Sequence, residues 1–309
     1  MAEPPGSSAS PPRQPGVPIA GPDPDIDGAV TSVLRTEDGL DLLVSSLPAG
    51  GRGVGAQGQA LIVHGYAEHH GRYGELVALL HRMGFSCLLL DLRGHGRSQG
   101  SRGHVADFEH YRHDLDLVLE KTGWSRDVPS LLFGHSLGGL IALEYVLHRP
   151  GRFDRLVVSS PFLAPAVEVP KLKVALGHLA AKVAPTLNLA GVLDPEMLTH
   201  DEEQQRRYRQ DPLIFQSFNP KWFLEVRDAQ QEVYERAGEI RIPALFLLGA
   251  SDAVADPQQG RQVFERLGSE AKTLRVYPQF FHEVLNESGR QRVYADVESW
   301  LRDSGIADS

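Results

Sequence analysis

The sequence predicts an α/β protein in which helices cover a mostly parallel central sheet on both faces. Continuously apolar, strand-like runs alternate along the chain with segments of helical periodicity. Strands that are apolar at nearly every position are typical of parallel sheets, because both faces of such sheets are buried. One long interval without a clear strand interrupts the alternation, which indicates an inserted cap.

The elements follow in order from the amino terminus. Residues 1–27 are rich in Pro, Gly and Ser and carry few large apolar groups, so we expect a disordered tail. A hairpin over 29–47, with its turn at Asp38-Gly39, and a glycine-rich connection over 50–58 come next. The expected strands of the sheet are 60–63, 85–91, 130–134, 155–160, 243–249 and 272–277, and the expected helices are 73–83, 108–121, 137–148, 258–267 and 290–301. These elements predict one core in two parts, 28–160 and 231–304, separated by a helical cap over 161–230.

Composition and charge narrow the classes of protein. The chain has 309 residues, of which 41% are hydrophobic and 23% charged, which are ordinary values for a globular enzyme. The formal net charge of −9 argues against a nucleic-acid-binding surface, which needs clustered positive charge. The single cysteine, Cys87, forms no intramolecular disulfide, and the first residues lack the basic and apolar segments of a signal peptide. We therefore expect a cytoplasmic protein, for which peripheral membrane contact stays open.

The strongest chemical motif is Gly134-His135-Ser136-Leu137-Gly138. It follows the strand-like run 130–133 and opens the expected helix at Leu137, which is the strand–turn–helix context of a nucleophile elbow. A serine hydroxyl is a weak nucleophile that needs exposure and a nearby base, and the sharp turn lifts the side chain out of the sheet. Flanking glycines avoid clashes in so tight a backbone. The motif therefore predicts that Ser136 is a catalytic nucleophile.

The matching acid and base are expected after later strands, in the chain order serine, carboxylate, histidine. Asp252 follows the run 243–249 and His282 follows the run 272–277, at the strand ends where α/β sheets place their sites. His282 would take the serine proton and return it to the leaving alcohol, while Asp252 would orient the imidazole. Asp256 is the alternative carboxylate, but its place before Pro257 is typical of a helix N-cap.

Two backbone N–H groups are needed to stabilise the oxyanion of a tetrahedral intermediate. Leu137, the residue after the expected nucleophile, is predicted to supply one of them. Tyr66, in the loop after the strand that ends at Val63, is predicted to supply the other.

Two further patterns suggest bound groups but lack the right context. The run Gly53-Val54-Gly55-Ala56-Gln57-Gly58 has the spacing of a dinucleotide-binding fingerprint, yet the strand-like run follows these glycines instead of preceding them. His64, His69 and His70 cluster without a cysteine or carboxylate at the usual metal-ligand spacing. We therefore expect neither a cofactor nor a metal.

Several blocks spread along the chain carry a family resemblance. They are His64-Gly65-Tyr66-Ala67-Glu68-His69 with Arg72-Tyr73, Asp91-Leu92-Arg93-Gly94-His95-Gly96-Arg97-Ser98 with Gly100, Arg102, Gly103 and Tyr111, Gly134 to Gly139, Asp211-Pro212-Leu213, Gly249 to Pro257, and His282-Glu283-Val284-Leu285-Asn286-Glu287. Together they resemble the monoacylglycerol lipase and lysophospholipase-like family of α/β-hydrolases, over roughly residues 58–302. The resemblance implies an α/β-hydrolase fold with a helical cap, no cofactor, and the hydrolysis of single-chain acyl esters.

The resemblance also implies roles for residues by position. It assigns Ser136, Asp252 and His282 to a catalytic triad, and the N–H groups of Tyr66 and Leu137 to an oxyanion hole. Glu68, His69 and Arg72 match polar residues near the oxyanion loop, where they either hold the loop in shape or contact the substrate. The implied partner is a small lipid ester, with a monoacylglycerol favoured. A short-chain ester, a lysophospholipid and a non-enzymatic ligand on the same fold are the alternatives.

One helix of the cap has two distinct faces. Leu172, Leu176, Leu179 and Val183 fall on one face, and Lys171, His178 and Lys182 fall on another. A basic amphipathic helix can lie on a lipid surface, whereas a lid helix covers the acyl pocket or the core with its apolar face. We favour the covering interpretation, and a lid that moves would allow both.

Overall fold

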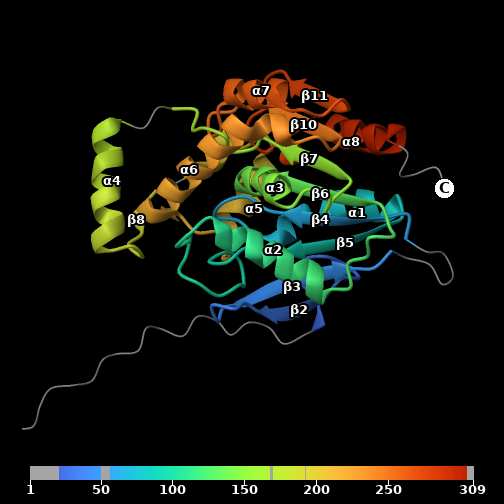
Figure 1. The fold of residues 1–309 in the computed structure, drawn as a ribbon, viewed down its shortest axis with the longest axis horizontal. Helices are drawn as coiled ribbons and strands as arrows, with labels where there is room; N and C mark the ends of the chain where they lie inside the picture. Colours follow the sequence, from blue (N-terminus) through green and yellow to red (C-terminus); the bar gives the residue numbers. More distant parts are fainter. Residues whose placement is uncertain (1–20, 50–55, 168–169, 192, 305–309) are drawn as a thin grey trace, which may run out of the picture.

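The computed structural model describes residues 21–49, 56–167, 170–191 and 193–304, without the side chains of 171–174. Within these residues the chain forms one nine-stranded sheet in the order β1-β2-β3-β5-β4-β6-β7-β10-β11, with helices on its two faces (Figure 1). The strands are β1 (Gly21–Pro22), β2 (Val30–Arg35), β3 (Asp41–Leu47), β4 (Gly58–Val63), β5 (Phe85–Leu90), β6 (Ser130–His135), β7 (Arg155–Ser159), β10 (Ala244–Gly249) and β11 (Lys272–Tyr277). Strands β5, β4, β6, β7, β10 and β11 run parallel to one another, and β1, β2 and β3 are antiparallel additions at one edge.

The helices lie on the faces of this sheet or in an insertion between β7 and β10. They are α1 (Gly74–Arg82), α2 (Glu109–Lys121), α3 (Leu137–His148), α4 (Lys171–Val183), α5 (Glu202–Gln210), α6 (Pro220–Arg236), α7 (Pro257–Arg266) and α8 (Gln291–Asp303). Short 3-10 helices cover His70–Tyr73, Pro195–Met197, Ala237–Glu239 and Val284–Asn286. The expected α/β architecture is confirmed, and each of the six strand-like runs and five helical segments forms the expected element.

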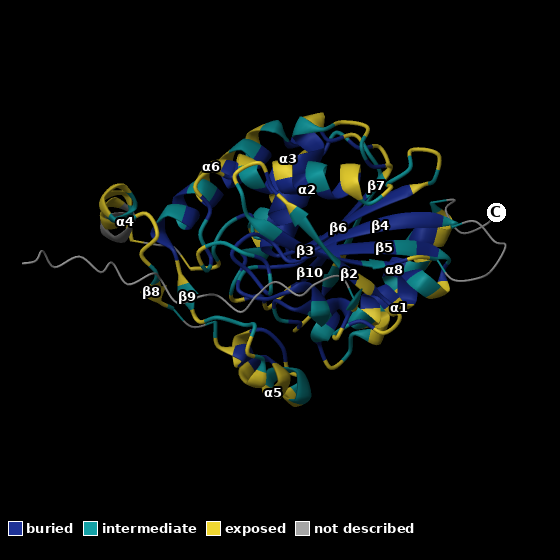
Figure 2. Ribbon diagram, turned by 90° about the horizontal axis from the view of Figure 1, so that it is seen from below, coloured by how far each residue is buried: buried dark blue, intermediate teal, exposed yellow. Residues whose placement is uncertain are grey.

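The central strands are buried on both faces, as their continuous apolar runs predict. In β4, Leu61 and Val63 pack in one buried cluster with residues of α2, α3, α6 and α7. Ala60 and Ile62, which point to the opposite face, pack in a second cluster with residues of α1 and α8. Successive side chains of a strand alternate between faces, so one apolar run supplies both cores. Figure 2 shows these strands as the buried centre of the molecule.

The amino-terminal boundary differs from the expectation. The structure describes residues 21–27, so the prediction that disorder extends through residue 27 is wrong for this stretch, while residues 1–20 lie outside the described residues. Gly21–Pro22 pairs with β2, Asp23 is buried, and Ile26 packs in the cluster below α1 and α8. The average composition of residues 1–27 does not reveal that Ile26 and Asp23 are buried, and these two residues hold this stretch against the core.

The insertion between β7 and β10 extends further along the chain than the cap expected over 161–230. Between β7 and β10 the chain forms α4, β8 (Leu189–Ala190), α5, β9 (Ser217–Phe218) and α6. The short strands β8 and β9 pair with each other in a region where no strand is expected. The expected cap boundary at residue 230 falls inside α6, because Val226, Ala229 and Val233 of that helix pack continuously into the core. None of the described helices combines the length and the apolar character needed to cross a bilayer.

Candidate active site

Four loops that follow parallel strands converge at one edge of the sheet. Tyr66 follows β4, Ser136 follows β6, Asp252 follows β10 and His282 follows β11. Because parallel strands present their carboxyl ends at the same edge, residues far apart in the sequence meet there. The structure brings together Ser136, Asp252 and His282 as the sequence predicts.

Ser136 occupies a strained turn between β6 and α3. Its φ of 52° lies in the left-handed region, which is costly for a residue with a side chain. The turn is held on both sides: the Ser136 N–H donates to Ser159 O at 2.9 Å, and the Phe162 N–H donates to Ser136 O at 2.9 Å. A Cβ on Gly138 would lie 2.1 Å from Val63 O, and a Cβ on Gly134 would lie 2.2 Å from Gly138 O. The glycines of the motif are therefore required by close backbone approach.

The three side chains form a continuous hydrogen-bonded row. His282 Nε2 lies 2.8 Å from Ser136 Oγ, and His282 Nδ1 lies 2.7 Å from Asp252 Oδ2. The other Asp252 oxygen accepts the N–H groups of Val254 and Ala255 at 2.8 and 2.9 Å, which fixes the carboxylate. The alternative acid, Asp256, instead caps α7 by accepting the Gln258 N–H at 2.9 Å. Only Asp252 of these two carboxylates therefore contacts the imidazole.

The surroundings of His282 set its proton affinity. Burial alone lowers the pKa of this imidazole, but the charge and hydrogen bond of Asp252 outweigh burial and raise it. His135, whose ring centroid lies 5.0 Å from that of His282, behaves differently. Burial, together with the neighbouring His282, lowers the pKa of His135 to about 4, so this imidazole stays neutral near pH 7. Sequence reasoning missed His135 as a site residue, although it lies inside the elbow motif.

Glu68 and Arg72 hold the loop after β4 in shape. Glu68 Oε1 accepts the Gly65 N–H at 2.6 Å and the Tyr73 hydroxyl at 2.7 Å, and Arg72 Nη1 donates to Glu68 Oε2 at 2.6 Å. Arg72 also makes a bidentate pair with Glu283 at 2.7 and 2.7 Å. Burial raises the pKa of the Glu68 carboxyl, but the Arg72 charge outweighs it and holds this pKa low. Glu283 was not predicted, although its position next to the expected base was a usable signal.

His69 contacts the insertion. Its Nε2 lies 2.8 Å from Asp211 Oδ2, at the end of α5. Of the three polar residues carried over from the resemblance, Glu68 and Arg72 line the cavity beside Ser136, whereas His69 does not.

A cavity of about 250 Å³ opens onto Ser136. Its lining outside the insertion comprises Gly65, Tyr66, Ala67, Glu68, Arg72, His135, Ser136, Leu137, Val254, His282 and Glu283, and its lining from the insertion comprises Phe162, Gly191, Leu193, Leu198, Tyr208, Phe215, Ser217, Phe218 and Trp222. Tyr66 packs against Trp222 with ring centroids 3.9 Å apart. The sequence analysis did not identify these cap aromatics, although the large rings of the insertion are a usable signal. The assignment of Tyr66 and Leu137 as oxyanion donors stays a prediction.

Helix α4 does not cover this cavity with its described side chains. Leu176, Leu179 and Val183 are 57%, 60% and 77% exposed, and none of the described side chains of α4 lines the cavity. The covering interpretation is therefore wrong for these three residues, because α4 packs beside α6 at the outer end of the molecule (Figure 1). The side chains of Lys171 and Leu172 lie outside the described part of the chain.

Two groups of side chains in the described part of the chain are close enough to ligate a metal ion, namely Asp25, His69 and His70, and Glu144, His148 and Glu232. In both groups ion pairs already engage these atoms. Examples are Asp25 with Arg97, His70 with Asp91, and Glu232 with Arg236.

Of the glycine-rich run expected not to bind a dinucleotide, residues 53–55 lie outside the described residues and Gly58 begins β4.

Comparison with known proteins extends the similarity beyond this site. Residues 55–289 match the protein family described as serine aminopeptidase, S33. The chain is 32% identical over 247 residues to a monoacylglycerol lipase of Mycolicibacterium smegmatis, a match that covers 79% of this chain and 88% of that protein. It is 29% identical over 247 residues to an uncharacterized abhydrolase domain-containing protein of Dictyostelium discoideum, of which it spans only 26%. The crystal structure of Paleococcus ferrophilus monoacylglycerol lipase is similar at a TM-score of 0.77 and 32% identity, covering 85% of this chain and 98% of that one.

Proposed function

The chain belongs to the α/β-hydrolase family described as serine aminopeptidase, S33, and from this premise we propose that it hydrolyses monoacylglycerols through an acyl-enzyme. The resemblance carried by the sequence blocks is confirmed at the level of the family and the fold. The observation that carries the proposal is the row Ser136–His282–Asp252, which opens onto a cavity lined by aromatic and aliphatic side chains.

The proposed reaction uses each member of this row. Ser136 Oγ attacks the ester carbonyl carbon while His282 Nε2 accepts the hydroxyl proton, and Asp252 stabilises the imidazolium that forms. The N–H groups of Leu137 and Tyr66 donate hydrogen bonds to the negatively charged tetrahedral oxygen. The bond from the carbonyl carbon to the alcohol oxygen then breaks, and the alcohol leaves with the proton from His282. Water, deprotonated by the same imidazole, attacks the acyl-serine, releases the carboxylic acid and restores the Ser136 hydroxyl.

The shape and chemistry of the cavity support a lipid substrate. Phe162, Phe215, Phe218, Trp222 and Leu193 offer an apolar surface for an acyl chain. The Glu68, Arg72 and Glu283 side chains offer the polar atoms that a hydroxylated head group needs. The names of the similar lipases agree with this substrate class.

Two measurements test the proposal together. Wild-type protein should be labelled by a serine-directed fluorophosphonate, and Ser136→Ala should not. A substrate panel that crosses acyl length with head group should give its highest kcat/KM for long-chain monoacylglycerols. Higher values for acetate esters, for lysophospholipids or for alanine p-nitroanilide would replace the proposed substrate, and an unlabelled wild type would favour a non-enzymatic ligand-binding role.

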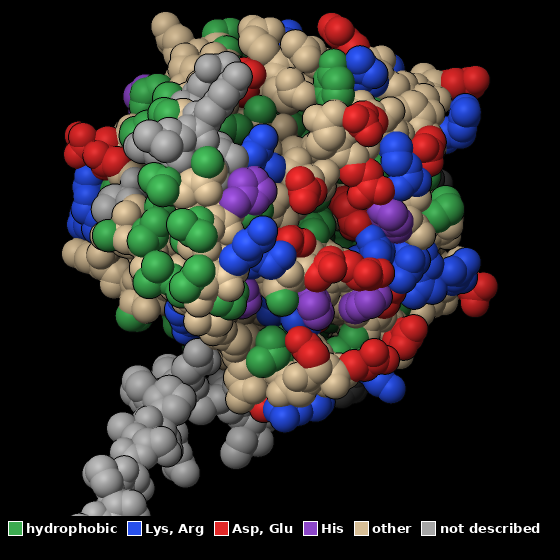
Figure 3. All heavy atoms as spheres, turned by 60° about the vertical axis from the view of Figure 1, so that its left-hand side comes forward, with side chains coloured by type: hydrophobic (Ala, Val, Ile, Leu, Met, Phe, Trp, Pro, Cys, Tyr) green, Lys and Arg blue, Asp and Glu red, His purple; other side chains and the backbone are tan. Residues whose placement is uncertain are grey.

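The exposed apolar side of the insertion supports contact with the lipid phase that holds such substrates. Leu176, Leu179, Val183, Leu187 and Leu189 are each at least 40% exposed. Figure 3 shows hydrophobic side chains gathered on this side of the molecule, beside lysine, arginine and histidine side chains. We propose that this surface, called the cap patch below, lies against lipid surfaces. Co-sedimentation with phospholipid vesicles should retain wild-type protein, and protein left wholly in the supernatant would contradict the contact.

A further inference from the structure

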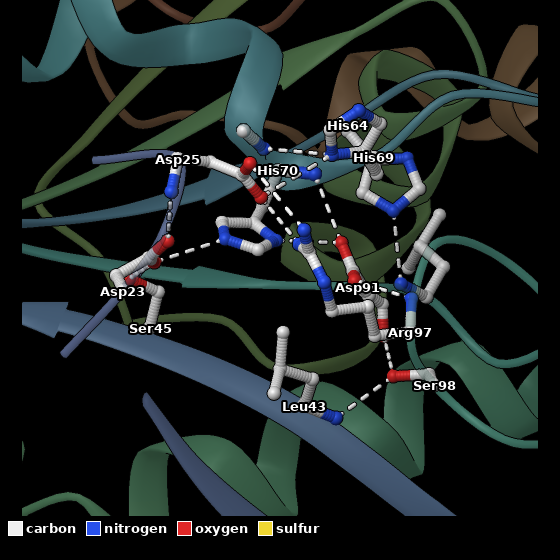
Figure 4. Close-up of polar contacts among 12 residues, drawn as sticks. Asp23, Asp25, Leu43, Ser45, His64, His69, His70, Asp91, Arg97 and Ser98 are labelled. Atoms are coloured by element: carbon white, nitrogen blue, oxygen red, sulfur yellow. Dashed lines mark hydrogen bonds and ion pairs between the residues drawn. The ribbon is translucent and has the colours of Figure 1, made fainter. Parts of the chain in front are cut away.

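The amino-terminal stretch 21–27 reaches the loop after β4 through buried charges, although it lies outside the matched family region, which begins at residue 55. We propose that Asp23 and His70 are positioning residues for ester hydrolysis, because with Asp91 they fix the loop that carries Tyr66 and Glu68. This inference rests on the proposed function. We call Asp23, His70 and Asp91 the clasp (Figure 4).

The clasp joins three segments that are distant in the sequence. His70 Nε2 lies 3.0 Å from Asp23 Oδ2, which follows β1, and His70 Nδ1 lies 2.7 Å from Asp91 Oδ1, which follows β5. The His70 backbone N–H also donates to Asp91 Oδ1 at 2.9 Å. The three side chains are 0–1% exposed. The position of His70 is thus fixed by both its ring and its backbone.

The geometry requires a charged imidazole between two carboxylates. An imidazole nitrogen can donate to a carboxylate only when it carries a proton, and here both ring nitrogens face carboxylate oxygens. Burial lowers the pKa of His70, but Asp91 and Asp23 outweigh it and raise this pKa to about 10. Burial raises the pKa of Asp23, but its hydrogen bonds with His70 and Ser45 outweigh it and lower the value to about 2. The positive charge of His70 therefore lies between two carboxylates, and removing Asp23 takes away one of its two partners.

A second set of contacts ties the same stretch to the site. Asp25 pairs with Arg97, whose backbone N–H donates to Asp91 Oδ2 at 2.7 Å. Asp25 also lies 4.0 Å from His69 Nδ1, and His69 Nε2 contacts Asp211 of the insertion. The adjacent residues His69 and His70 thus connect the amino-terminal stretch, the loop and the insertion.

The loop in question carries groups that the proposed reaction needs in fixed positions. Only one residue separates His70 from Glu68, whose Oε1 holds the Gly65 N–H next to the Tyr66 N–H. A Cβ on Gly65 would lie 3.2 Å from the Ser136 Cβ, so this backbone runs directly against the nucleophile. A small displacement of the loop would move an oxyanion donor, and such misplacement costs up to about 100-fold in rate.

The test compares two aspartates of the same short stretch in the full chain. Asp23→Asn should lower kcat at least about tenfold, with KM for a monoacylglycerol changed less than about twofold. Asp27→Asn is the matched control, because Asp27 is exposed, and it should keep wild-type kcat. Rates are normalised to the fraction of sites labelled by fluorophosphonate, so that misfolded protein does not count. A wild-type kcat per labelled site in Asp23→Asn would overturn the proposal.

Ser45→Ala keeps the test decisive if Asp23→Asn folds poorly, and a double-mutant cycle measures the coupling if it folds well. Ser45→Ala removes only the hydroxyl that donates to Asp23 and should lower kcat in the same direction by a smaller factor. In Asp23→Asn/His70→Gln the two effects should not be additive, because the two side chains contact each other. Additive effects, or a Ser45→Ala variant identical to wild type, would contradict the clasp.

A readout that needs no activity separates this inference from the proposed function. Hydrogen exchange of peptides covering 64–73 should be faster in Asp23→Asn than in wild type, and unchanged in Asp27→Asn. If exchange is faster in Asp23→Asn but the wild-type protein hydrolyses no ester, the clasp is supported and the proposed substrate is rejected. Unchanged exchange would reject the clasp whatever the substrate is.

Discussion

The side chains at the catalytic edge of the sheet and those of the cap patch are in opposite situations. At the edge, Ser136, His282 and Asp252 are buried and each is held by a partner from another loop. On the cap patch, Leu176 and Leu179 are 57% and 60% exposed. The difference teaches that loops following the sheet hold these three side chains in place, whereas the insertion leaves its apolar cap patch exposed.

The charged groups of the two regions differ in the same way. Arg72 is 11% exposed and lies between the buried carboxylates Glu68 and Glu283. On α5 in the insertion, Arg207 pairs with Glu203 while it is 68% exposed. Exposed pairs are worth about 0–1 kcal/mol, whereas breaking a buried pair costs about 3–5 kcal/mol. We therefore expect substitutions at the edge to have large effects and those in the cap to have small ones.

The largest effect is expected at the nucleophile. Ser136→Ala should lower kcat on a monoacylglycerol on the order of a million-fold, because the acyl-enzyme cannot form without the Ser136 hydroxyl. The fold should stay intact, so the variant should bind substrate without turning it over. Steady-state kinetics beside the exposed control Ser299→Ala measure the difference. A residual activity within a hundredfold of wild type would remove Ser136 from the mechanism.

The next effect separates the two acids of one loop. Asp252→Asn should lower kcat about 10⁴-fold, because the imidazole loses the carboxylate that orients it. The matched control, Asp256→Asn, keeps an oxygen that can cap α7 and should keep nearly full activity. Equal losses in the two variants would contradict the assignment.

The same pair carries a pH signature. Since Asp252 raises the pKa of His282 and only the neutral imidazole accepts a proton, wild-type kcat/KM falls as the pH drops through this raised pKa. In Asp252→Asn burial prevails and lowers the pKa, so the acid limb of the residual activity should move to lower pH. If the acid limb of the pH profile lies at the same pH in Asp252→Asn and in wild type, a group other than His282 controls it.

A smaller effect on stability is expected at Arg72. Arg72→Met leaves Glu68 and Glu283 buried together without their cation, and should lower the free energy of unfolding at pH 7 by about 3–5 kcal/mol. The pKa of Glu68 is lower in the folded protein than in the unfolded chain. The stability that wild type has over Arg72→Met is therefore present above about pH 4.5 and is lost as the pH falls toward about 2. Urea unfolding at pH 7 and at pH 3 measures both statements. Arg207→Met is the exposed control and should change stability by less than about 0.5 kcal/mol.

The sequence predicts that Ser136, Asp252 and His282 meet at one edge of the sheet, because its signals there are local. Ser136, Asp252 and His282 each follow an apolar run, and the ends of parallel strands meet wherever the helices between them lie. The bidentate pair of Arg72 and Glu283 joins residues 211 positions apart, and although Glu283 adjoins the expected base, no local pattern says that Arg72 is its partner. Such contacts depend on how loops pack after the sheet has formed.

The order of residues 21–27 and the exposure of the apolar face of α4 were predicted wrongly for a related reason. Composition averages over a segment, so the burial of Asp23 and Ile26 is hidden among Pro, Gly and Ser. Periodicity identifies the apolar face of α4 but does not say what that face meets. The two errors are opposite in kind. A polar stretch expected to be disordered is held by buried charged groups, and an apolar face expected to be buried stays exposed.

The smallest effect on stability is expected on the cap patch, and it tests the comparison directly. Leu176→Ala and Leu179→Ala should each change the free energy of unfolding by less than about 0.5 kcal/mol, because water already reaches these side chains. Leu140→Ala, the buried control on α3, should cost about 2–5 kcal/mol. Urea unfolding measures all three.

Activity then distinguishes an idle surface from one that contacts lipid. The double variant Leu176→Ala/Leu179→Ala should lose turnover of monoacylglycerol in vesicles while it keeps turnover of a dispersed short-chain ester, because only the first requires docking. Equal rates on both substrates would leave the cap patch without a role in access. A loss of several kcal/mol of stability would mean that these leucines are buried in solution, and the contrast between a fixed edge and an exposed cap would no longer hold.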